Sequence, residues 1–106
     1  KTNDWNAFII NDSNETLEMV LIVSKGYTKD KVTSKMRHKL EKLPAKSYAK
    51  IELMQPEVLE LNNEFNVTFF EGNKMFDKTY VFKKNSINKK AFQTIPLMNL
   101  KGILVK

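Results

Sequence analysis

The stretch that decides the fold class is EFNVTFFEGNKMFDKTYVFK, residues 64–83 of the 106-residue chain. Residues 65–70 and 78–83 are rich in β-branched and aromatic side chains, and they lie on either side of Glu71, Gly72 and Asn73. Glycine and asparagine tolerate the positive φ angles that tight turns need, so this arrangement predicts a β-hairpin. The hairpin in turn predicts an antiparallel β fold.

Other segments alternate apolar and polar residues as half-buried strands do. They are residues 5–10, 16–24 and 48–54, and we expect residues 102–105 to close the sheet as a last strand. About seven short strands separated by turn signals fit a two-layer antiparallel sandwich. We therefore predict that residues 1–106 form a single, mainly β domain, an antiparallel β-sandwich of the transthyretin or immunoglobulin type, with a small barrel as the alternative.

The alternation within residues 48–54 also predicts which side chains face the interior. Ala49, Ile51 and Leu53 share one face of this strand, whereas Lys50 and Glu52 share the other. A strand with one buried and one solvated face shows this pattern. Glu52 is therefore expected to point toward solvent.

Residues 28–43 contain the one predicted helix, a short one near residues 29–41. Apolar residues recur there at helical spacing, at Val32, Met36, Leu40 and Leu43. The alternative is an irregular strand in which Met36, His38 and Leu40 share a face.

Composition limits the class of protein further. A chain of 106 residues is the usual size of one domain, and no apolar run approaches the ~20 residues of a membrane-spanning helix. Cysteine is absent, which excludes disulfides, zinc fingers and thiol catalysis. The chain begins at Lys1 rather than methionine, so we expect a processed form, with a signal peptide or lipid-bearing cysteine upstream of residue 1.

Charge is unevenly distributed along the chain. Eighteen basic residues exceed twelve acidic ones, giving a net charge of +6. Bases dominate residues 25–50 and 73–106, and acids dominate residues 1–24 and 51–72. One interpretation is that neighbouring strands of opposite sign neutralise each other across a sheet. The other is a basic face that meets an acidic partner or a membrane surface.

The single histidine is the first candidate for chemistry. His38 lies among Lys35, Arg37 and Lys39, and no sequence pattern supplies it with an oriented carboxylate or a paired nucleophile. We therefore expect it to be a solvated residue on a polar face.

Carboxylates are the second candidate for chemistry. Glu57, Glu60, Glu64 and Glu71 lack the close spacing of acidic residues that a calcium loop requires. The sequence also gives no support for two of these glutamates acting as the paired carboxylates of a glycosidase. The sequence thus predicts no catalytic residue, no metal site and no cofactor.

Aromatic residues alternate with lysines in residues 76–84. Such a segment could stack bases while its ammonium groups follow phosphates, as in single-strand binders. Tyr80 and Phe82 share one face, however, and are more economically placed in a core. Single-stranded nucleic-acid binding and a small enzyme without a recognisable motif are therefore kept as the alternatives.

The order of segments resembles a known family. The points of likeness are two N-terminal strands split by residues 11–15, the inserted segment 28–43, the proline turn 43–47 and the hairpin 65–82. In these points the chain resembles the transthyretin-like β-sandwich lipoproteins of bacterial secretion systems, in particular the outer-membrane lipoprotein of type VI secretion. The resemblance implies an acylated N-terminal cysteine, anchorage in the outer membrane and a loop that docks onto an inner-membrane partner. This chain shows no such cysteine, and no residue role is transferred.

We accordingly expect a non-catalytic protein–protein interaction module of a bacterial envelope or secretion assembly. Its expected location is the periplasm, with the cytoplasm as the alternative, and it would touch a membrane only through a lipid anchor. Turns and basic connections are the expected contact sites, because loops carry binding functions more often than strands do. The predicted partner-binding residues are Lys29, Lys31, Lys35, Arg37, Lys83, Lys84, Lys89 and Lys90.

Overall fold

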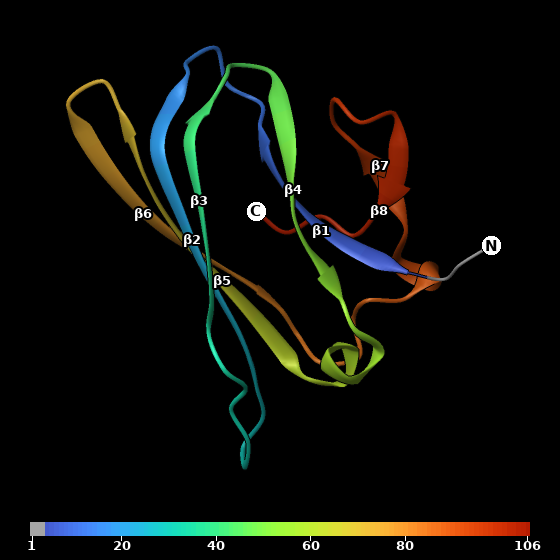
Figure 1. Ribbon diagram of the computed structural model, residues 1–106. Helices are drawn as coiled ribbons and strands as arrows, with labels where there is room; N and C mark the ends of the chain where they lie inside the picture. Colours follow the sequence, from blue (N-terminus) through green and yellow to red (C-terminus); the bar gives the residue numbers. More distant parts are fainter. Residues whose placement is uncertain (1–3) are drawn as a thin grey trace.

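The computed structural model describes residues 4–106, and its strands pair in antiparallel sheets (Figure 1). The strands are β1 (Trp5–Asn11), β2 (Leu17–Tyr27), β3 (Met36–Leu43), β4 (Ser47–Met54), β5 (Asn62–Glu71), β6 (Lys74–Phe82), β7 (Gln93–Ile95) and β8 (Leu100–Gly102). Two short 3₁₀ turns, η1 (Pro56–Glu60) and η2 (Lys89–Ala91), complete the elements of this part of the chain. The predicted antiparallel β fold is confirmed.

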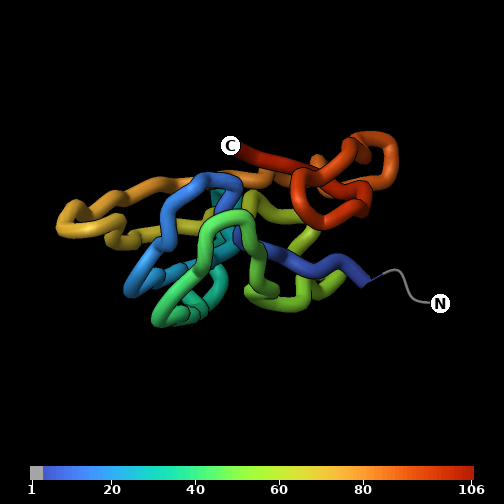
Figure 2. The backbone as a smooth tube through the Cα atoms, turned by 90° about the horizontal axis from the view of Figure 1, so that it is seen from above, coloured from blue at the N-terminus to red at the C-terminus, as the bar shows by residue number. Residues whose placement is uncertain are grey.

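The strands form one larger sheet and two strand pairs. The larger sheet has the order β3-β2-β5-β6, β1 pairs with β4, and β7 pairs with β8. Figure 2 shows the β1–β2 and β3–β4 connections next to each other, with the β5–β6 hairpin and the β7–β8 hairpin at opposite ends of the molecule. Consecutive strands β3 and β4 therefore belong to different sheets.

The predicted hairpin is confirmed as β5 and β6. Glu71 pairs with Lys74, so Gly72 and Asn73 form the loop. Gly72 has a φ of 65°, in the left-handed region where a side chain would be strained. Phe69 and Phe76 stack across the pair, with ring centroids 5.3 Å apart.

One hydrophobic cluster joins the four-stranded sheet to the β1–β4 pair. Its fully buried members come from β2, β3, β4 and β5, and they are Leu17, Val20, Ile22, Leu43, Met54, Phe65 and Val67. Trp5, Ala7 and Ile9 of β1 pack against this cluster, as the alternation in residues 5–10 predicts. Burial of this shared cluster holds the two sheets together, since apolar burial is the main favourable term in folding.

A buried asparagine side chain ties together the turns that connect the two sheets. The Nδ2 group of Asn11 donates to the carbonyl oxygens of Glu15, Leu43 and Pro44, at 2.8, 3.1 and 3.0 Å. Its Oδ1 accepts from both the backbone and the hydroxyl of Ser13. The β1–β2 and β3–β4 connections are thereby held against each other.

The predicted helix in residues 28–43 is wrong. β3 begins at Met36, residues 28–35 form its connection to β2, and η1 and η2 are the only helical turns in residues 4–106. Two of the apolar residues at helical spacing, Met36 and Leu40, also share parity on a strand, and Leu40 pairs with Val20 of β2. Pairing with the neighbouring strand prevails over the local pattern, and Val32 is left 68% exposed.

The prediction of which side chains in residues 48–54 point to the interior is wrong after Ile51. The β1–β4 register shifts between Ala7 and Phe8, which leaves Ile51 without a partner as a β-bulge. The extra residue reverses the alternation, so Leu53 is 42% exposed whereas the Glu52 side chain is only 15% exposed. The bulge therefore turns Glu52 toward the interior.

The prediction that residues 102–105 close the sheet is also wrong. β8 ends at Gly102 and pairs only with β7. Leu97 and Asn99 have φ angles of 70° and 57°, so the chain reverses sharply between these two strands. Closing a short local loop costs little conformational entropy, which favours a separate hairpin over the distant sheet.

Candidate functional site

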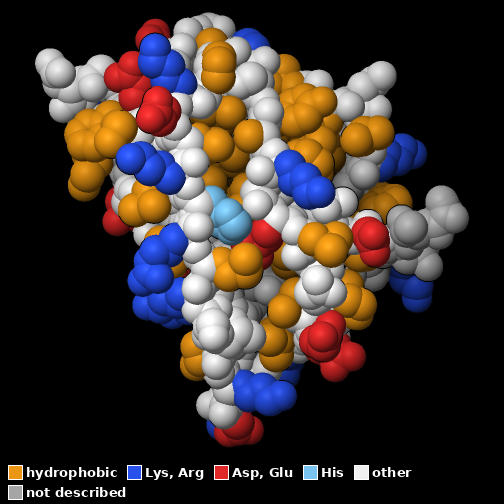
Figure 3. Space-filling view, in the orientation of Figure 1, with side chains coloured by type: hydrophobic (Ala, Val, Ile, Leu, Met, Phe, Trp, Pro, Cys, Tyr) orange, Lys and Arg blue, Asp and Glu red, His pale blue; other side chains and the backbone are white. Residues whose placement is uncertain are grey.

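Positively charged side chains lie along the β3 edge of the four-stranded sheet, and Figure 3 shows several of them to the left of the single histidine. The β2–β3 register places Arg37 and Lys39 on the face that points away from the hydrophobic cluster. Arg37 also lines a shallow groove of about 320 Å³ together with Lys25 and Lys35. We call these four residues the cationic strip.

Only part of the cationic strip is balanced by acidic groups. The ammonium of Lys25 lies 3.9 Å from Oε2 of Glu64 on β5 and 5.8 Å from the ring centroid of Tyr27. Lys35, Arg37 and Lys39 form no ion pair with any residue among 4–106. The predicted neutralisation between neighbouring strands is thus seen for the Lys25–Glu64 pair, and the rest of the strip keeps its positive field.

The structure divides the predicted partner-binding residues between separate places. Lys35 and Arg37 belong to the cationic strip, and Lys29 and Lys31 lie in the β2–β3 connection. The four lysines predicted in residues 83–90 lie on the connection from β6 to β7, on the opposite side of the ribbon in Figure 1. The eight residues therefore do not form one surface. Lys25 was missed because only the strand register brings it beside Arg37, and Lys39 was missed because a helix would place it on a different face from Arg37.

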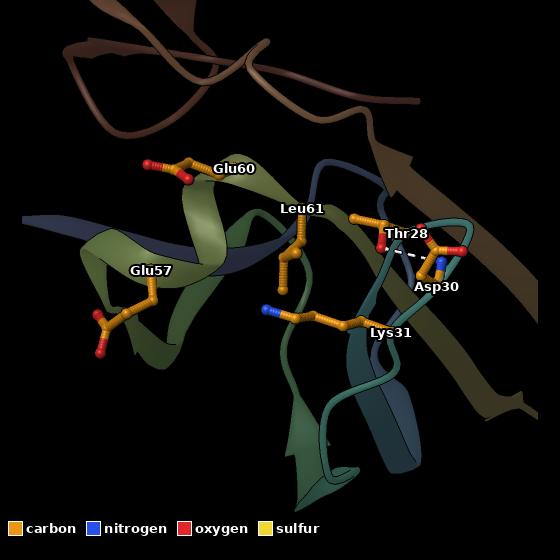
Figure 4. Close-up of a pocket in the computed structure, with 6 residues that line it drawn as sticks. All are labelled: Thr28, Asp30, Lys31, Glu57, Glu60 and Leu61. Carbon is orange, nitrogen blue, oxygen red and sulfur yellow. Dashed lines mark hydrogen bonds between the residues drawn. The ribbon is translucent and has the colours of Figure 1, made fainter.

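A second hollow of about 470 Å³ lies between the β2–β3 connection and η1 (Figure 4). It is lined by Thr28, Asp30, Lys31, Glu57, Glu60 and Leu61. Figure 4 shows the carboxylates of Glu57 and Glu60 pointing away from Lys31, and the backbone N–H of Asp30 donates to Thr28 Oγ1 at 3.3 Å. Charged groups that diverge in this way do not make an acid–base or metal site.

The boundary between β3 and β4, which we call the seam, contains a polar bridge between the two sheets. Oε1 of Glu52 on β4 accepts from the hydroxyl of Ser24 on β2 at 2.9 Å and from Nε2 of His38 on β3 at 2.8 Å. Ser24 is buried, with an exposed fraction of 4%. Figure 3 shows the histidine side chain at the seam, with apolar side chains visible beside it.

The prediction of a solvated His38 on a polar face is wrong. The bulge at Ile51 brings Glu52 inward, and β3 pairs with β2 so that His38 shares the inner face with Leu40. Sequence reasoning missed this partner because a one-residue bulge has no signature in a strand of ordinary residues.

The bridge between these three residues does not have the geometry of a catalytic triad. In a triad the histidine lies between the nucleophile and the carboxylate and takes the proton of the nucleophile. Here Glu52 lies between Ser24 and His38, and the serine hydroxyl donates to the carboxylate. The arrangement joins β2, β3 and β4 and is suited to holding the two sheets in register.

Other chemistry finds no support in the described part of the chain. Residues 4–106 contain no cluster of three or more histidine, aspartate or glutamate side chains that could hold a metal ion. No helix within them is long and apolar enough to cross a bilayer. The lipid anchor expected upstream of residue 1 lies outside the described residues.

Comparison with protein-family models finds no match, and comparison with curated proteins and with solved structures finds no protein with significant similarity.

Proposed function

We propose that this protein is a non-catalytic interaction module that binds an acidic protein partner through the cationic strip. The observation that carries the proposal is a set of three cations that form no ion pair within residues 4–106: Arg37 and Lys39 on the outer face of the edge strand β3, and Lys35 immediately before it. Several unpaired charges of one sign attract an oppositely charged partner and speed its association.

We further propose that the two sheets with their shared cluster form an open β-sandwich of the immunoglobulin or transthyretin type. The register and the buried residues common to both sheets support this class. A rigid sandwich presents binding groups on a fixed scaffold, which suits a module whose role is contact rather than catalysis. In the hollow beside η1 the charged groups diverge, and within residues 4–106 the groove on the cationic strip holds one ion pair together with the unpaired Lys35 and Arg37, which favours binding over a small enzyme.

The proposed setting is a bacterial envelope or secretion assembly in the periplasm, with a lipid anchor upstream of residue 1. This setting rests on the resemblance in segment order alone. The inserted segment 28–43 no longer supports that resemblance as a helical insertion, because it contains β3. Fractionation of the source cells with an antibody to this chain tests the setting, and recovery only in the cytoplasmic fraction would refute it.

Nucleic-acid binding has less support than protein binding. Tyr80 and Phe82, the aromatic residues that would stack bases, are half-buried and pack against the hydrophobic cluster. Base stacking requires aromatic faces that are open to the strand. The aromatic residue beside the cationic strip, Tyr27, already has the ammonium of Lys25 over its ring, 5.8 Å from the centroid.

The test of the proposed function compares two charge-reversed variants. The strip variant carries Lys35→Glu, Arg37→Glu and Lys39→Glu, and the control variant carries the same charge change at Lys83, Lys84 and Lys90. Fluorescence anisotropy with a labelled oligoglutamate peptide measures Kd at two salt concentrations. We expect the strip variant to bind about tenfold more weakly or worse, and the control to change by less than about threefold.

Two outcomes would contradict the proposal. Equal loss in both variants would mean that net charge alone binds the peptide. Tighter binding of a thymidine oligonucleotide than of oligoglutamate, at equal ionic strength, would favour the nucleic-acid alternative. Circular dichroism on each variant confirms that the fold is retained.

A further inference from the structure

Within residues 4–106, the free edge of β3 has no strand paired with it through backbone hydrogen bonds, although β4 lies across the seam. β3 is the terminal strand of the four-stranded sheet, and β4, which follows it in the chain, pairs only with β1. No backbone hydrogen bond from another segment of residues 4–106 reaches Met36–Leu43 on its free side. An edge strand presents unpaired N–H and C=O groups that another extended chain can bind.

The two edges of this sheet differ in their protection. On the β6 edge, Lys78 pairs with the buried Val67 and therefore lies on the inner face of the sheet. An inward-facing lysine at an edge prevents the addition of another strand, because the added strand would bury its charge. The β3 edge has no such residue, since its inner face carries Met36, His38 and Leu40.

The inner face of the β3 edge offers apolar contacts to an added strand. Met36 is an inner-face residue of β3 and is nevertheless 50% exposed, and Leu40 packs only partly against the cluster. Both lie along the seam, where Figure 3 shows apolar side chains at the surface. A strand placed there would cover them with every second side chain.

The outer face of the same edge is positively charged, so it favours an added strand that carries negative charge. Arg37 and Lys39 alternate with these inner-face residues and belong to the cationic strip. Antiparallel pairing of β3 with β3 of a second copy can at best match Arg37 with Glu41, and in that register the Lys39 side chains of the two copies lie opposite each other, which is destabilising. The charge complement therefore favours a partner that carries carboxylates at alternate positions.

We propose that β3 binds an extended segment of an acidic partner protein as an added antiparallel strand. In this segment Asp or Glu alternates with apolar residues, so that the carboxylates meet the cationic strip and the apolar side chains enter the seam. The inference rests on the proposed function, because the same strip supplies the charge, and it adds the mode of binding and the sequence pattern of the partner.

The test uses N-methylated peptides with the complete chain of 106 residues. The parent peptide alternates glutamate and valine over eight residues, the length of β3. One derivative is N-methylated at its valines and the other at its glutamates, so each blocks the hydrogen bonds of one peptide edge only. We expect one derivative to bind about tenfold more weakly or worse, and the other to bind within about threefold of the parent.

The protein side is tested by hydrogen exchange. Amides within residues 36–43 are expected to gain protection when the parent peptide binds, whereas amides of β6 are expected to be unchanged. The Arg37→Glu, Lys39→Glu double variant is expected to lose both the binding and this protection. Reversal of Lys74 and Lys78 on β6 provides the matched control.

The outcomes separate the binding mode from the proposed function. If both methylated peptides bind like the parent, or both are weakened equally, strand addition is refuted while binding to an acidic peptide stands. If the parent does not bind at all, the proposed function fails as well. Protection of β3 that rises with protein concentration without peptide would make a second copy the occupant and overturn the proposal.

Discussion

Because Glu52 bridges Ser24 and His38, we expect the substitution Glu52→Ala to lower the free energy of unfolding substantially. Glu52→Ala removes the oxygen that accepts from both Ser24 and His38. Ser24 is buried, and a buried hydroxyl left without a partner costs about 1–3 kcal/mol. His38 is partly exposed and can turn to water, so its loss adds only about 0.5 kcal/mol. We expect the free energy of unfolding to fall by about 2–3 kcal/mol.

The assay is urea unfolding followed by tryptophan fluorescence and circular dichroism. Trp5 lies on β1 beside Phe92, with ring centroids 5.6 Å apart, so its emission reports on the smaller sheet. Circular dichroism reports on all strands, and agreement of the two transitions supports two-state unfolding. In thermal unfolding the same loss lowers Tm by roughly 10 °C.

Two further variants make the reasoning refutable. Glu41→Ala on β3 changes an exposed glutamate without a hydrogen bond and should change stability by less than about 0.5 kcal/mol. In the Ser24→Ala, Glu52→Ala double variant no hydroxyl is left unpaired, so it should be less destabilised than the sum of the single variants. If Glu52→Ala costs no more than Glu41→Ala, the bridge does not stabilise the two sheets.

Three other substitutions test separate features of the fold. Ile22→Ala, at a side chain that is 1% exposed, should lower the free energy of unfolding by about 3 kcal/mol in urea unfolding, through lost burial and a cavity. Asn11→Ala removes the donor to the carbonyls of Leu43 and Pro44 and should cost about 2 kcal/mol, with hydrogen exchange increased in both connecting turns. Gly72→Ala introduces a Cβ atom that has no neighbour within 4 Å, but the residue has a positive φ angle. The free energy of unfolding should therefore fall by about 1 kcal/mol, which thermal unfolding would show as a lower Tm.

Local signals were sufficient for the elements that are defined by their own residues. The hairpin of β5 and β6 was predictable because Gly72 and Asn73 form the turn and the flanking residues favour strands. β1 was predictable because Trp5, Ala7 and Ile9 recur at a period of two, and they do share the inner face.

Features that depend on pairing with distant strands were not predictable. Residues 36–43 form a strand because β2 offers them an edge, and the spacing of Met36 and Leu40 is compatible with either a helix or a strand. The facing of Glu52 depends on the bulge at Ile51, which the register with β1 creates. Of the cationic strip, Lys35 and Arg37 were predicted. Lys25 joins them only through the strand register, and Lys39 shares a face with Arg37 because residues 36–43 are a strand rather than a helix.

The bulge at Ile51 also bears on how this chain could change in evolution. Loss of the codon for Ile51 would restore a regular strand in which Glu52 still pairs with Ala7 and stays on the inner face. His38 and the buried Ser24 would keep their common acceptor after such a deletion. We therefore expect relatives that lack the bulged residue to retain polar side chains at all three positions, because loss of any one of them would leave the others without their partner.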